Sequence, residues 1–491
     1  QQAFFILLMS KYNYAGVDLG SSFIKGSVLD EDGTHLVTVR SQAPQILSPK
    51  TGWTEIDPFE YYFIFRRFLR KLLKYVKSDK IYLGFSSMAP VFIPIDNECY
   101  PLYRGILYND TRAKKEIEEL KPLIGDIVFK ENGNPLNNQQ WLPKILWYRK
   151  NYPNLYEKTW KFIELTTFII CKLTNKVTTD ITMLQEEGVL NYQKKEISDK
   201  ILEAMNLKRE LLPDHINLNE MLESFSIDGK EFYVNAGTID LIGSSVSLNM
   251  LEKDKLAIIL GSTGVINYSA TDPKPDKRLY LDLSPVPGIY YVNGCTSAAG
   301  IFLDYIMYLL GMKGKFKKMD KYYSENEVET SGLVMLPYIL GERTPIFDPY
   351  AKSVIFGITN LHNKMHLIKA AIESIAFSMK HHYEILQELN YNFDRVYLTG
   401  GLSNLKIVQK TLPSVLEVPM IKIEEGDETI GDARIAMVGS KNYKWGDIKS
   451  LGEKSIFGYK LNYEKIPYYD KNYAIYKELY TRLKDMFKTC Q

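Results

Sequence analysis

Two short bends, far apart in the chain, carry residue types that bind phosphate. DLGSS begins at Asp18 and LGSTG begins at Leu260, and each follows an apolar run. Small side chains let backbone amides approach phosphate oxygens closely, so two such bends could clamp one polyphosphate. Either bend alone is more typical of an ordinary hairpin turn, and it is the pair that favours phosphate binding. The residues concerned are Gly20, Ser21 and Ser22 in the first bend and Gly261, Ser262, Thr263 and Gly264 in the second.

Charged residues flank the first bend. Asp18 immediately precedes it and Lys25 follows it. Magnesium usually keeps several waters and takes only one or two carboxylates together with phosphate oxygens. Asp18 is therefore the candidate magnesium ligand, directly or through water. Lys25 either lies near the phosphates or simply covers the surface, and both interpretations remain open.

A second aspartate lies in GTIDLIGSS, where apolar residues precede Asp240 and small residues follow it. Solubility alone does not explain an acid between Ile239 and Leu241. One interpretation is a helix N-cap. The other is a general base placed against a substrate hydroxyl, and both interpretations remain open at this point.

Two further motifs are suited to the other parts of a ligand. GILYNDTRA brings Asn109, Asp110 and Arg112 together, and these groups can bind the vicinal hydroxyls of a sugar. The alternative is a helix start with Asp110 as its N-cap, and both can hold at once. LTGGLSN, which contains Gly400 and Gly401, is a strand-to-helix junction that could seat adenine or ribose, although a tight turn is its ordinary interpretation.

Other classes of site lack their motifs. GMKGKF has no serine or threonine after its Gly-Lys pair, no GxGxxG follows a strand pattern, and HExxH is absent. The formal net charge of +2 is too small to suggest a nucleic-acid partner or a polybasic membrane surface. The cysteines are far apart and form no CxxC pair, so we expect reduced thiols in a cytoplasmic protein rather than disulfides or a metal site. They are Cys99, Cys171, Cys295 and Cys490.

The elements that position these residues repeat one layout. A chain of 491 residues is too long for one compact core, so two or more domains are expected. Each half shows a strand, a bend of small residues, a second strand and then helices. In the first half a three-stranded antiparallel meander precedes a helix with Asp57 as N-cap and Pro58 at its first position. The predicted strands lie at 13–19, 23–30, 35–41, 81–87, 290–294 and 394–401, and two more flank the second bend within 255–270. The predicted helices lie at 57–77, 299–311 and 363–389, and another begins near Ser403. A helix-rich region is predicted at 113–207.

Taken in order, these motifs resemble the FGGY family of carbohydrate kinases from about Tyr14 to Gly439. The stretches that carry the resemblance are GVDLGSSFIKG, GWTEIDP, GILYNDTRA, GNPL with PKILW, GTIDLIGSS, LGSTGVI, LPYILGERTPIFDP, GITNLH, LTGGLSN and GDARIAMVG. The resemblance implies an α/β fold of two actin-like (ribonuclease-H-like) ATPase domains with a cleft between them. It further implies a sugar-binding domain at 14–247 and an ATP-binding domain at 248–491, after an N-terminal extension at 1–13 in which Met9 could be the true start.

The resemblance also implies roles for single residues. Asp240 matches the catalytic base, which accepts the proton of a sugar hydroxyl as that oxygen attacks the γ-phosphorus of ATP. Asp18 matches a residue near Mg2+ and the γ-phosphate, and the two bends match the phosphate-binding loops. Gly400, Gly401 and Asn404 flank the adenosine, and Asn109 and Asp110 lie near the sugar. Alignment and charge stabilisation dominate such a transfer.

Two departures from the family pattern bear on the substrate. Members that use xylulose often carry Met-His after the first long helix, where this chain has Met88 followed by Ala89. The residue after the catalytic aspartate is commonly Asn or Gln and is Leu241 here. A ketopentose such as xylulose is the first expectation, with Met88 at the substrate. A gluconate or other sugar-acid or polyol kinase is the alternative, and glycerol is disfavoured.

Rival classes are an actin-like ATPase without a sugar substrate and a catalytically inactive sugar sensor. GWTEIDP, NDTRA and GTID disfavour the first, and the presence of both Asp18 and Asp240 disfavours the second. The expected partner is a small-molecule sugar, with no nucleic acid and no membrane, and homodimer formation is left open.

Overall fold

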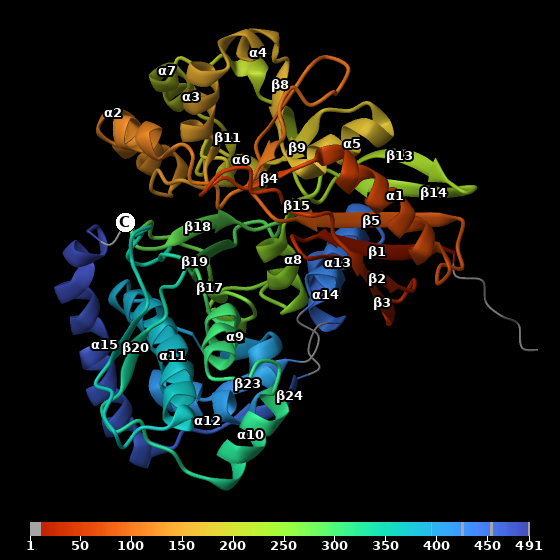
Figure 1. The fold of residues 1–491 in the computed structure, drawn as a ribbon. Helices are drawn as coiled ribbons and strands as arrows, with labels where there is room; N and C mark the ends of the chain where they lie inside the picture. The colour runs from red at the N-terminus through yellow and green to blue at the C-terminus, as the bar shows by residue number, and fades with distance from the viewer. Residues whose placement is uncertain (1–10, 394, 424–426, 452–454, 490–491) are drawn as a thin grey trace, which may run out of the picture. The chain divides into compact units, whose positions relative to one another are not determined.

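The computed structural model describes residues 11–393, 395–423, 427–451 and 455–489, so most of the predicted N-terminal extension, Asp394 and Cys490 lie outside the described residues. The chain forms two compact α/β units (Figure 1). Unit 1 comprises residues 1–251, 282–290 and 425–453, and unit 2 comprises residues 252–281, 291–424 and 454–491. The units are therefore not consecutive halves of the chain, because two later segments return to unit 1. A single cut after residue 247 would not separate them.

Unit 1 is built on a seven-stranded mixed sheet. The predicted meander is confirmed, since β1 pairs antiparallel with β2 and β2 pairs antiparallel with β3. On its other side β1 runs parallel to β5, and β5 runs parallel to β14 and to β15. The order is β13 (Met221–Ile227), β14 (Lys230–Asn235), β5 (Lys80–Ser87), β1 (Asn13–Leu19), β2 (Phe23–Leu29) and β3 (His35–Gln42), with β15 (Thr238–Ile239) beside β5.

Helices cover both faces of this sheet. Helix α1 (Pro58–Leu73) begins as predicted, because the Asp57 side chain accepts a hydrogen bond from the Phe59 amide and Pro58 occupies the first turn. Its apolar stripe, which includes Phe65 and Leu69, packs in the core of one face. Helix α13 (Glu428–Gly439) lies on the opposite face, where the backbone of the sheet at Gly16 approaches Thr429 closely.

The remaining elements of unit 1 surround the sheet. They are α2 (Lys114–Asn132), α3 (Trp141–Asn151), α4 (Pro153–Lys158), α5 (Leu165–Thr174), α6 (Ile181–Glu186), α7 (Asp199–Met205), α8 (Asp240–Ser247) and α14 (Trp445–Leu451), with the 3-10 turn η1 (Arg209–Leu211) and the short strand pairs β4 (Glu55–Ile56) with β7 (Gly105–Ile106), β6 (Ile93–Ile95) with β8 (Lys161–Ile163), β9 (Thr178–Asp180) with β12 (Asp214–Ile216), and β10 (Leu190–Asn191) with β11 (Glu196–Ile197). The helix-rich region predicted at 113–207 is confirmed. Among these elements, α2, α3, α6 and α7 form a second core. The buried aromatic side chains of Trp141 and Tyr148 on α3 lie at the centre of this core.

Unit 2 repeats the strand arrangement of unit 1. β16 pairs antiparallel with β17 and parallel with β22, as β1 does with β2 and β5. The order is β18 (Tyr280–Leu283), β19 (Tyr290–Thr296), β17 (Gly264–Ala270), β16 (Lys255–Leu260), β22 (Arg395–Thr399), β23 (Met420–Ile423) and β24 (Ser455–Tyr459). The duplicated layout expected from the sequence is therefore present.

Helices α9 (Gly300–Leu309), α11 (Lys364–Glu388) and α12 (Lys406–Leu416) pack with β16 through residues such as Leu260, Leu303 and Ile372. The predicted helix near Ser403 proves to be a 3-10 turn, η2 (Gly401–Asn404), before α12 begins at Lys406. Unit 2 also contains α10 (Phe316–Glu325), α15 (Ile466–Phe487), the strand pair β20 (Val334–Leu336) with β21 (Val354–Phe356), and the turn η3 (Tyr463–Lys465).

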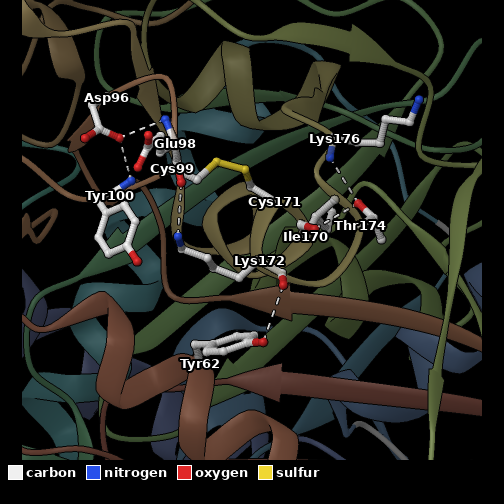
Figure 2. Close-up of a disulfide and its surroundings, with 10 residues drawn as sticks. All are labelled: Tyr62, Asp96, Glu98, Cys99, Tyr100, Ile170, Cys171, Lys172, Thr174 and Lys176. Carbon is white, nitrogen blue, oxygen red and sulfur yellow. Dashed lines mark hydrogen bonds between the residues drawn. A yellow bond between two sulfur atoms is a disulfide. The ribbon is translucent and has the colours of Figure 1, made fainter.

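The expectation of reduced thiols is wrong for one pair of cysteines. Cys99 and Cys171 form a disulfide in unit 1 (Figure 2). Asp96 shapes the turn that presents Cys99, because its carboxylate accepts hydrogen bonds from the amides of Glu98 and Tyr100. Cys171 lies on α5, 72 residues further along the chain. Neither position has a local motif, so only the fold reveals that they meet. Cys295 is buried outside this disulfide, and its thiol donates a hydrogen bond to the amide oxygen of Asn293.

Within the described residues, the structure has no helix that is long and apolar enough to cross a membrane.

Candidate active site

The carboxyl ends of three neighbouring strands of unit 1 bring the predicted acidic residues together. Asp18 on β1 lies opposite Ser86 on β5, and Thr238 on β15 lies on the other side of Ser86. Asp240 follows β15 directly and is the first residue of α8. Because parallel strands end at the same edge of a sheet, Asp18, Ser86 and Asp240 share this edge. Asp18 is buried, whereas Asp240 is exposed.

Sequence reasoning missed a third carboxylate at this edge. Asp432 on α13 accepts a hydrogen bond of 2.7 Å from the Ser86 hydroxyl, which lies 3.4 Å from an oxygen of Asp18. Helix α13 can approach the sheet this closely because β5 has a glycine, Gly84, where the two meet. A Cβ at Gly84 would lie 2.1 Å from the Asp432 carbonyl oxygen. The motif GDARIAMVG contained Asp432, but nothing in its spacing pointed to β1.

The same close approach fixes α8 against α13. A Cβ on Gly431 would lie 1.8 Å from the carbonyl oxygen of Gly243 on α8. This glycine pair therefore sets the distance between the helix that carries Asp432 and the helix that begins at Asp240.

Burial and mutual repulsion favour the protonated carboxyls at this edge. Burial raises the pKa of Asp18 well above its ordinary value, and the charges of Glu428 and Asp240 raise it further. Burial likewise raises the pKa of Asp432, against the hydrogen bond from Ser86. Such groups ionise readily only when a cation compensates their charge.

These residues fit a magnesium ion that is shared with phosphate. The Oδ1 atom of Asp432 is buried and has no hydrogen-bond partner within the described part of the chain. No group of three or more His, Cys, Asp or Glu side chains among the described residues is arranged to hold a metal ion by itself. Magnesium takes only one or two carboxylates when phosphate oxygens and waters complete its shell, so Asp18 and Asp432 suffice for that arrangement.

Lys25 lies opposite Asp18 across the β1–β2 pair and forms an ion pair with Glu428 at the start of α13. Burial lowers the pKa of Lys25, but the carboxylate of Glu428 outweighs it and the net shift is upward. Its ammonium group is thus held by a protein carboxylate in this structure.

The two bends are held by their carbonyl groups in different ways. In the first, the carbonyl oxygen of Gly20 accepts a hydrogen bond from the Tyr61 hydroxyl, and that of Ser22 accepts one from the Ala43 amide. In the second, the carbonyl oxygen of Gly261 accepts from the amide of Gly300 at the start of α9. Ser21, Ser22 and Ser262 are exposed.

The β22–η2 junction lies beside the second bend. The parallel register pairs Ile259 with Thr399, so Gly400 follows its strand at the same edge as Gly261. Gly400 has a φ of +92°, and a Cβ there would lie 2.5 Å from the Leu260 carbonyl oxygen. Gly401 has open space around it. The amide oxygen of Asn404 accepts a hydrogen bond of 2.6 Å from the Lys422 ammonium group.

The residues expected at the sugar lie together, but they are engaged differently. Asp110 is buried and binds Arg112, whose guanidinium also contacts Glu55 at 2.8 Å. Asp110 is not a helix N-cap, because α2 starts at Lys114 after Ala113. Its carboxylate instead accepts from the Thr54 amide and orders the loop. Asn109 is exposed beside it.

Met88 is buried at the end of β5, and its amide donates a hydrogen bond to the carbonyl of Leu19.

Helix α6 adds residues that the sequence did not single out. The Thr182 hydroxyl lies 2.8 Å from that of Thr238, and Gln185 accepts a hydrogen bond of 2.6 Å from the Leu283 amide.

Glu186, at the end of α6, lies close enough to Asp282 and Asp240 to interact with them electrostatically. Burial raises its pKa well above the ordinary value, and the carboxylates of Asp282 and Asp240 raise it further. The neighbourhood of Asp240 is therefore rich in carboxyl groups, and the raised pKa of Glu186 favours its protonated, neutral form.

Comparison with known proteins agrees with this geometry. Residues 13–240 match the N-terminal domain, and residues 256–440 the C-terminal domain, of the FGGY family of carbohydrate kinases. A xylulose kinase of Lactococcus lactis is 28% identical over 488 residues, 95% of this chain and 96% of that protein. A gluconokinase of Bacillus subtilis is 23% identical over 432 residues, 83% of each chain. The ligand-bound xylulose kinase structure from Lactobacillus acidophilus has a TM-score of 0.89 at 21% identity and covers 98% of this chain and 100% of that chain.

Proposed function

The chain belongs to the FGGY family of carbohydrate kinases, and from this premise we propose that it transfers the γ-phosphoryl group of ATP to a hydroxyl of xylulose or a similar neutral ketopentose. The observation that carries the proposal is the edge of unit 1, where an exposed carboxylate, Asp240, lies beside the buried pair Asp18 and Asp432. An enzyme without a sugar acceptor, such as an actin-like ATPase, is excluded by the family. The carbohydrate is a small-molecule substrate.

In this proposal Asp240 orients the acceptor hydroxyl and takes its proton as the oxygen attacks phosphorus. An exposed carboxylate at the first turn of a helix can meet a substrate directly. Asp18 and Asp432 would hold Mg2+, which compensates the charge of the phosphate oxygens when it is bound. The bend Gly261–Gly264 and the Gly400–Gly401 junction would receive the nucleotide, because both offer backbone groups without bulky side chains.

The acidic surroundings of Asp240 support a neutral sugar over a sugar acid. Glu186 lies near Asp282 and Asp240 in unit 1, and burial together with these neighbouring carboxyl groups raises its pKa, which favours its protonated form. A substrate carboxylate could approach these groups only while they stay protonated, whereas sugar hydroxyls can form hydrogen bonds with them in either protonation state. The xylulose kinase relative agrees with this preference, and the gluconokinase relative keeps a sugar acid as the second candidate.

A substrate panel tests the proposal. We would measure ADP release with Mg-ATP and xylulose, ribulose, gluconate or glycerol, each against a sample without acceptor. We expect xylulose or another neutral ketose to give the highest kcat/KM. If gluconate gives the highest kcat/KM, the proposed substrate is wrong but the assignment as a carbohydrate kinase stands. If no carbohydrate stimulates ADP release, the proposal that the acceptor is one of these carbohydrates is wrong.

Two lesser proposals concern the setting of the enzyme. A homodimer is supported by β21, which pairs only with β20 within the described residues and exposes Ile355 and Phe356. Sedimentation equilibrium tests it, and a monomer at micromolar concentration would refute it.

A cytoplasmic location follows from the proposed use of ATP, although the Cys99–Cys171 disulfide removes the argument from reduced thiols. Fractionation of the source cells tests it.

A further inference from the structure

Unit 2 has a second concave site, on the side of α10 that the candidate active site does not use. A groove of about 400 Å3 is formed by the turn after α9, one face of α10 and the start of α11. Its volume lies in the range of sites that hold small molecules. Its charged and polar lining consists of Lys315, Lys318, Lys321, Lys364, Tyr322 and Glu325.

The pattern of α10 explains why this face is open and basic. Lys318, Lys321 and Tyr322 lie at helical spacing on one side, while Met319 and Tyr323 are buried on the other. The Tyr323 hydroxyl donates a hydrogen bond to the carbonyl of Met365, which fixes the start of α11 beside α10. The groove therefore has a fixed frame, although its lysines are exposed.

The charges of the groove are unbalanced. Only Glu325 opposes the four lysines, and it lies 3.7 Å from Lys321 in an exposed pair, which contributes little. Lys318 and Lys364 have no carboxylate partner in the part of the chain that the structure describes. Four ammonium groups around one hollow give a positive potential that attracts a multiply charged anion.

We propose that this groove binds a small phosphorylated anion with at least two phosphoryl groups. Lysine is a point-charge binder of phosphate, and several phosphate oxygens can engage several ammonium groups at once. Met312 and Met365 supply buried apolar surface at the base of the groove for the carbon part of such a ligand. The Tyr322 side chain adds a hydroxyl to the lining.

The groove is separate from the candidate nucleotide site. Helix α9 starts at Gly300 beside the second bend and reaches the groove only after its last residue, Leu309, a helix length of about 15 Å. On α10 the residue that turns toward the nucleotide elements is Asp320, which accepts a hydrogen bond from the Ile407 amide at the start of α12. At 3.6 residues per turn, Asp320 lies nearly opposite Lys318 on α10 and about a quarter of a turn away from Lys321.

Inorganic pyrophosphate is the probe for the test. The full chain would be titrated calorimetrically with pyrophosphate in the presence of saturating Mg-ADP, which occupies the nucleotide site. We expect one pyrophosphate to bind. The variant Lys318→Gln/Lys364→Gln should bind about tenfold more weakly or worse, because hydrogen bonds to charged groups are lost. Lys318→Arg/Lys364→Arg should retain most of the affinity.

The control is Lys484→Gln/Lys488→Gln, which removes two exposed lysines near the end of unit 2. We expect its affinity for pyrophosphate to equal that of the unchanged chain, and thermal unfolding would confirm that all variants fold. Equal weakening in the control pair would show non-specific attraction and overturn the proposal. Absence of any binding that survives Mg-ADP would also overturn it. Neither result depends on which sugar the enzyme phosphorylates.

Discussion

The corresponding edges of the two sheets have the same strand arrangement and opposite chemistry. At the edge of unit 1, Asp18 and Asp432 bring buried carboxylates to the ends of β1 and β5. At the edge of unit 2, the ends of β16 and β22 carry glycine, serine and threonine in the second bend and at the junction. Both units thus carry a bend of small residues after the first strand, but unit 1 also places buried carboxylates beside it. An arrangement of strands therefore does not fix the chemistry of its edge, which depends on a few residues placed there.

The largest effect is expected when the carboxylate of Asp240 is removed from the edge of unit 1. Asp240→Asn should lower kcat by about a thousandfold, because general base catalysis typically contributes between about a hundredfold and ten-thousandfold. Binding of ADP should change little, since the candidate nucleotide elements are in unit 2. Steady-state kinetics and a nucleotide titration measure the two effects. Retained transfer would remove Asp240 from the base role.

The next prediction concerns the packing beneath the charged edge. Gly431→Ala should lower the free energy of unfolding by about 3 kcal/mol, because its Cβ meets the backbone of Gly243 and not a flexible side chain. Denaturant unfolding measures the loss. Gly125→Ala on α2 is the matched control, since a Cβ there has open space, and we expect it to be neutral or slightly stabilising. Equal stability of the two variants would contradict the glycine-contact argument.

A smaller effect is expected from a substitution at the edge of unit 2, beside the second bend. Gly300→Ala would put a Cβ 2.6 Å from the Gly261 carbonyl oxygen and displace the second bend. We expect the KM for ATP to rise roughly tenfold with a smaller change in kcat, because a uniform loss of binding acts on KM. Gly401→Ala, at the same edge but with room for a Cβ, is the control. If both variants behave alike, displacement of the bend is not the cause.

The last prediction separates the effect of charge from that of side-chain shape in unit 1. Asp180 caps α6, and burial raises its pKa to about 7 from an ordinary value of 3.8. The folded state then holds a proton that the unfolded state has released, so the stability that Asp180 contributes falls as pH rises from about 4 to about 7. Asp180→Asn should equal the unchanged chain in stability near pH 4 and exceed it by at most about 4 kcal/mol at pH 8, which is the free energy that corresponds to this rise in pKa. Thermal unfolding across this pH range measures the difference, and a constant difference would argue against the raised pKa.

Local signals predicted much of the fold. The meander, the N-cap at Asp57 and the second hairpin depend on residues close together in the chain, and all are present. The family resemblance also held. Features that join distant segments were not visible, because no local pattern encodes them. Asp432 reaches Asp18 only through α13, Cys99 reaches Cys171 only through the packing of α5, and Asp110 accepts from Thr54 instead of capping α2.

The roles of the site residues remain predictions, because they depend on how each side chain is engaged in the folded protein. The structure brings Asp18 and Asp240 to one edge and holds Lys25 in an ion pair with Glu428. Whether that lysine meets phosphate depends on charge and competition, which a residue pattern does not contain. Asn404 likewise has a protein partner, Lys422, that its motif did not indicate.

The disulfide makes part of unit 1 a covalent ring. The chain between Cys99 and Cys171 contains the GILYNDTRA loop with Asn109 and Asp110, and helices α2, α3 and α4. A single protease cut between Tyr100 and Ile170 would leave both fragments linked through sulfur. The cut enzyme would migrate as one molecule until a reducing agent released the pieces, so this segment can be opened without being lost.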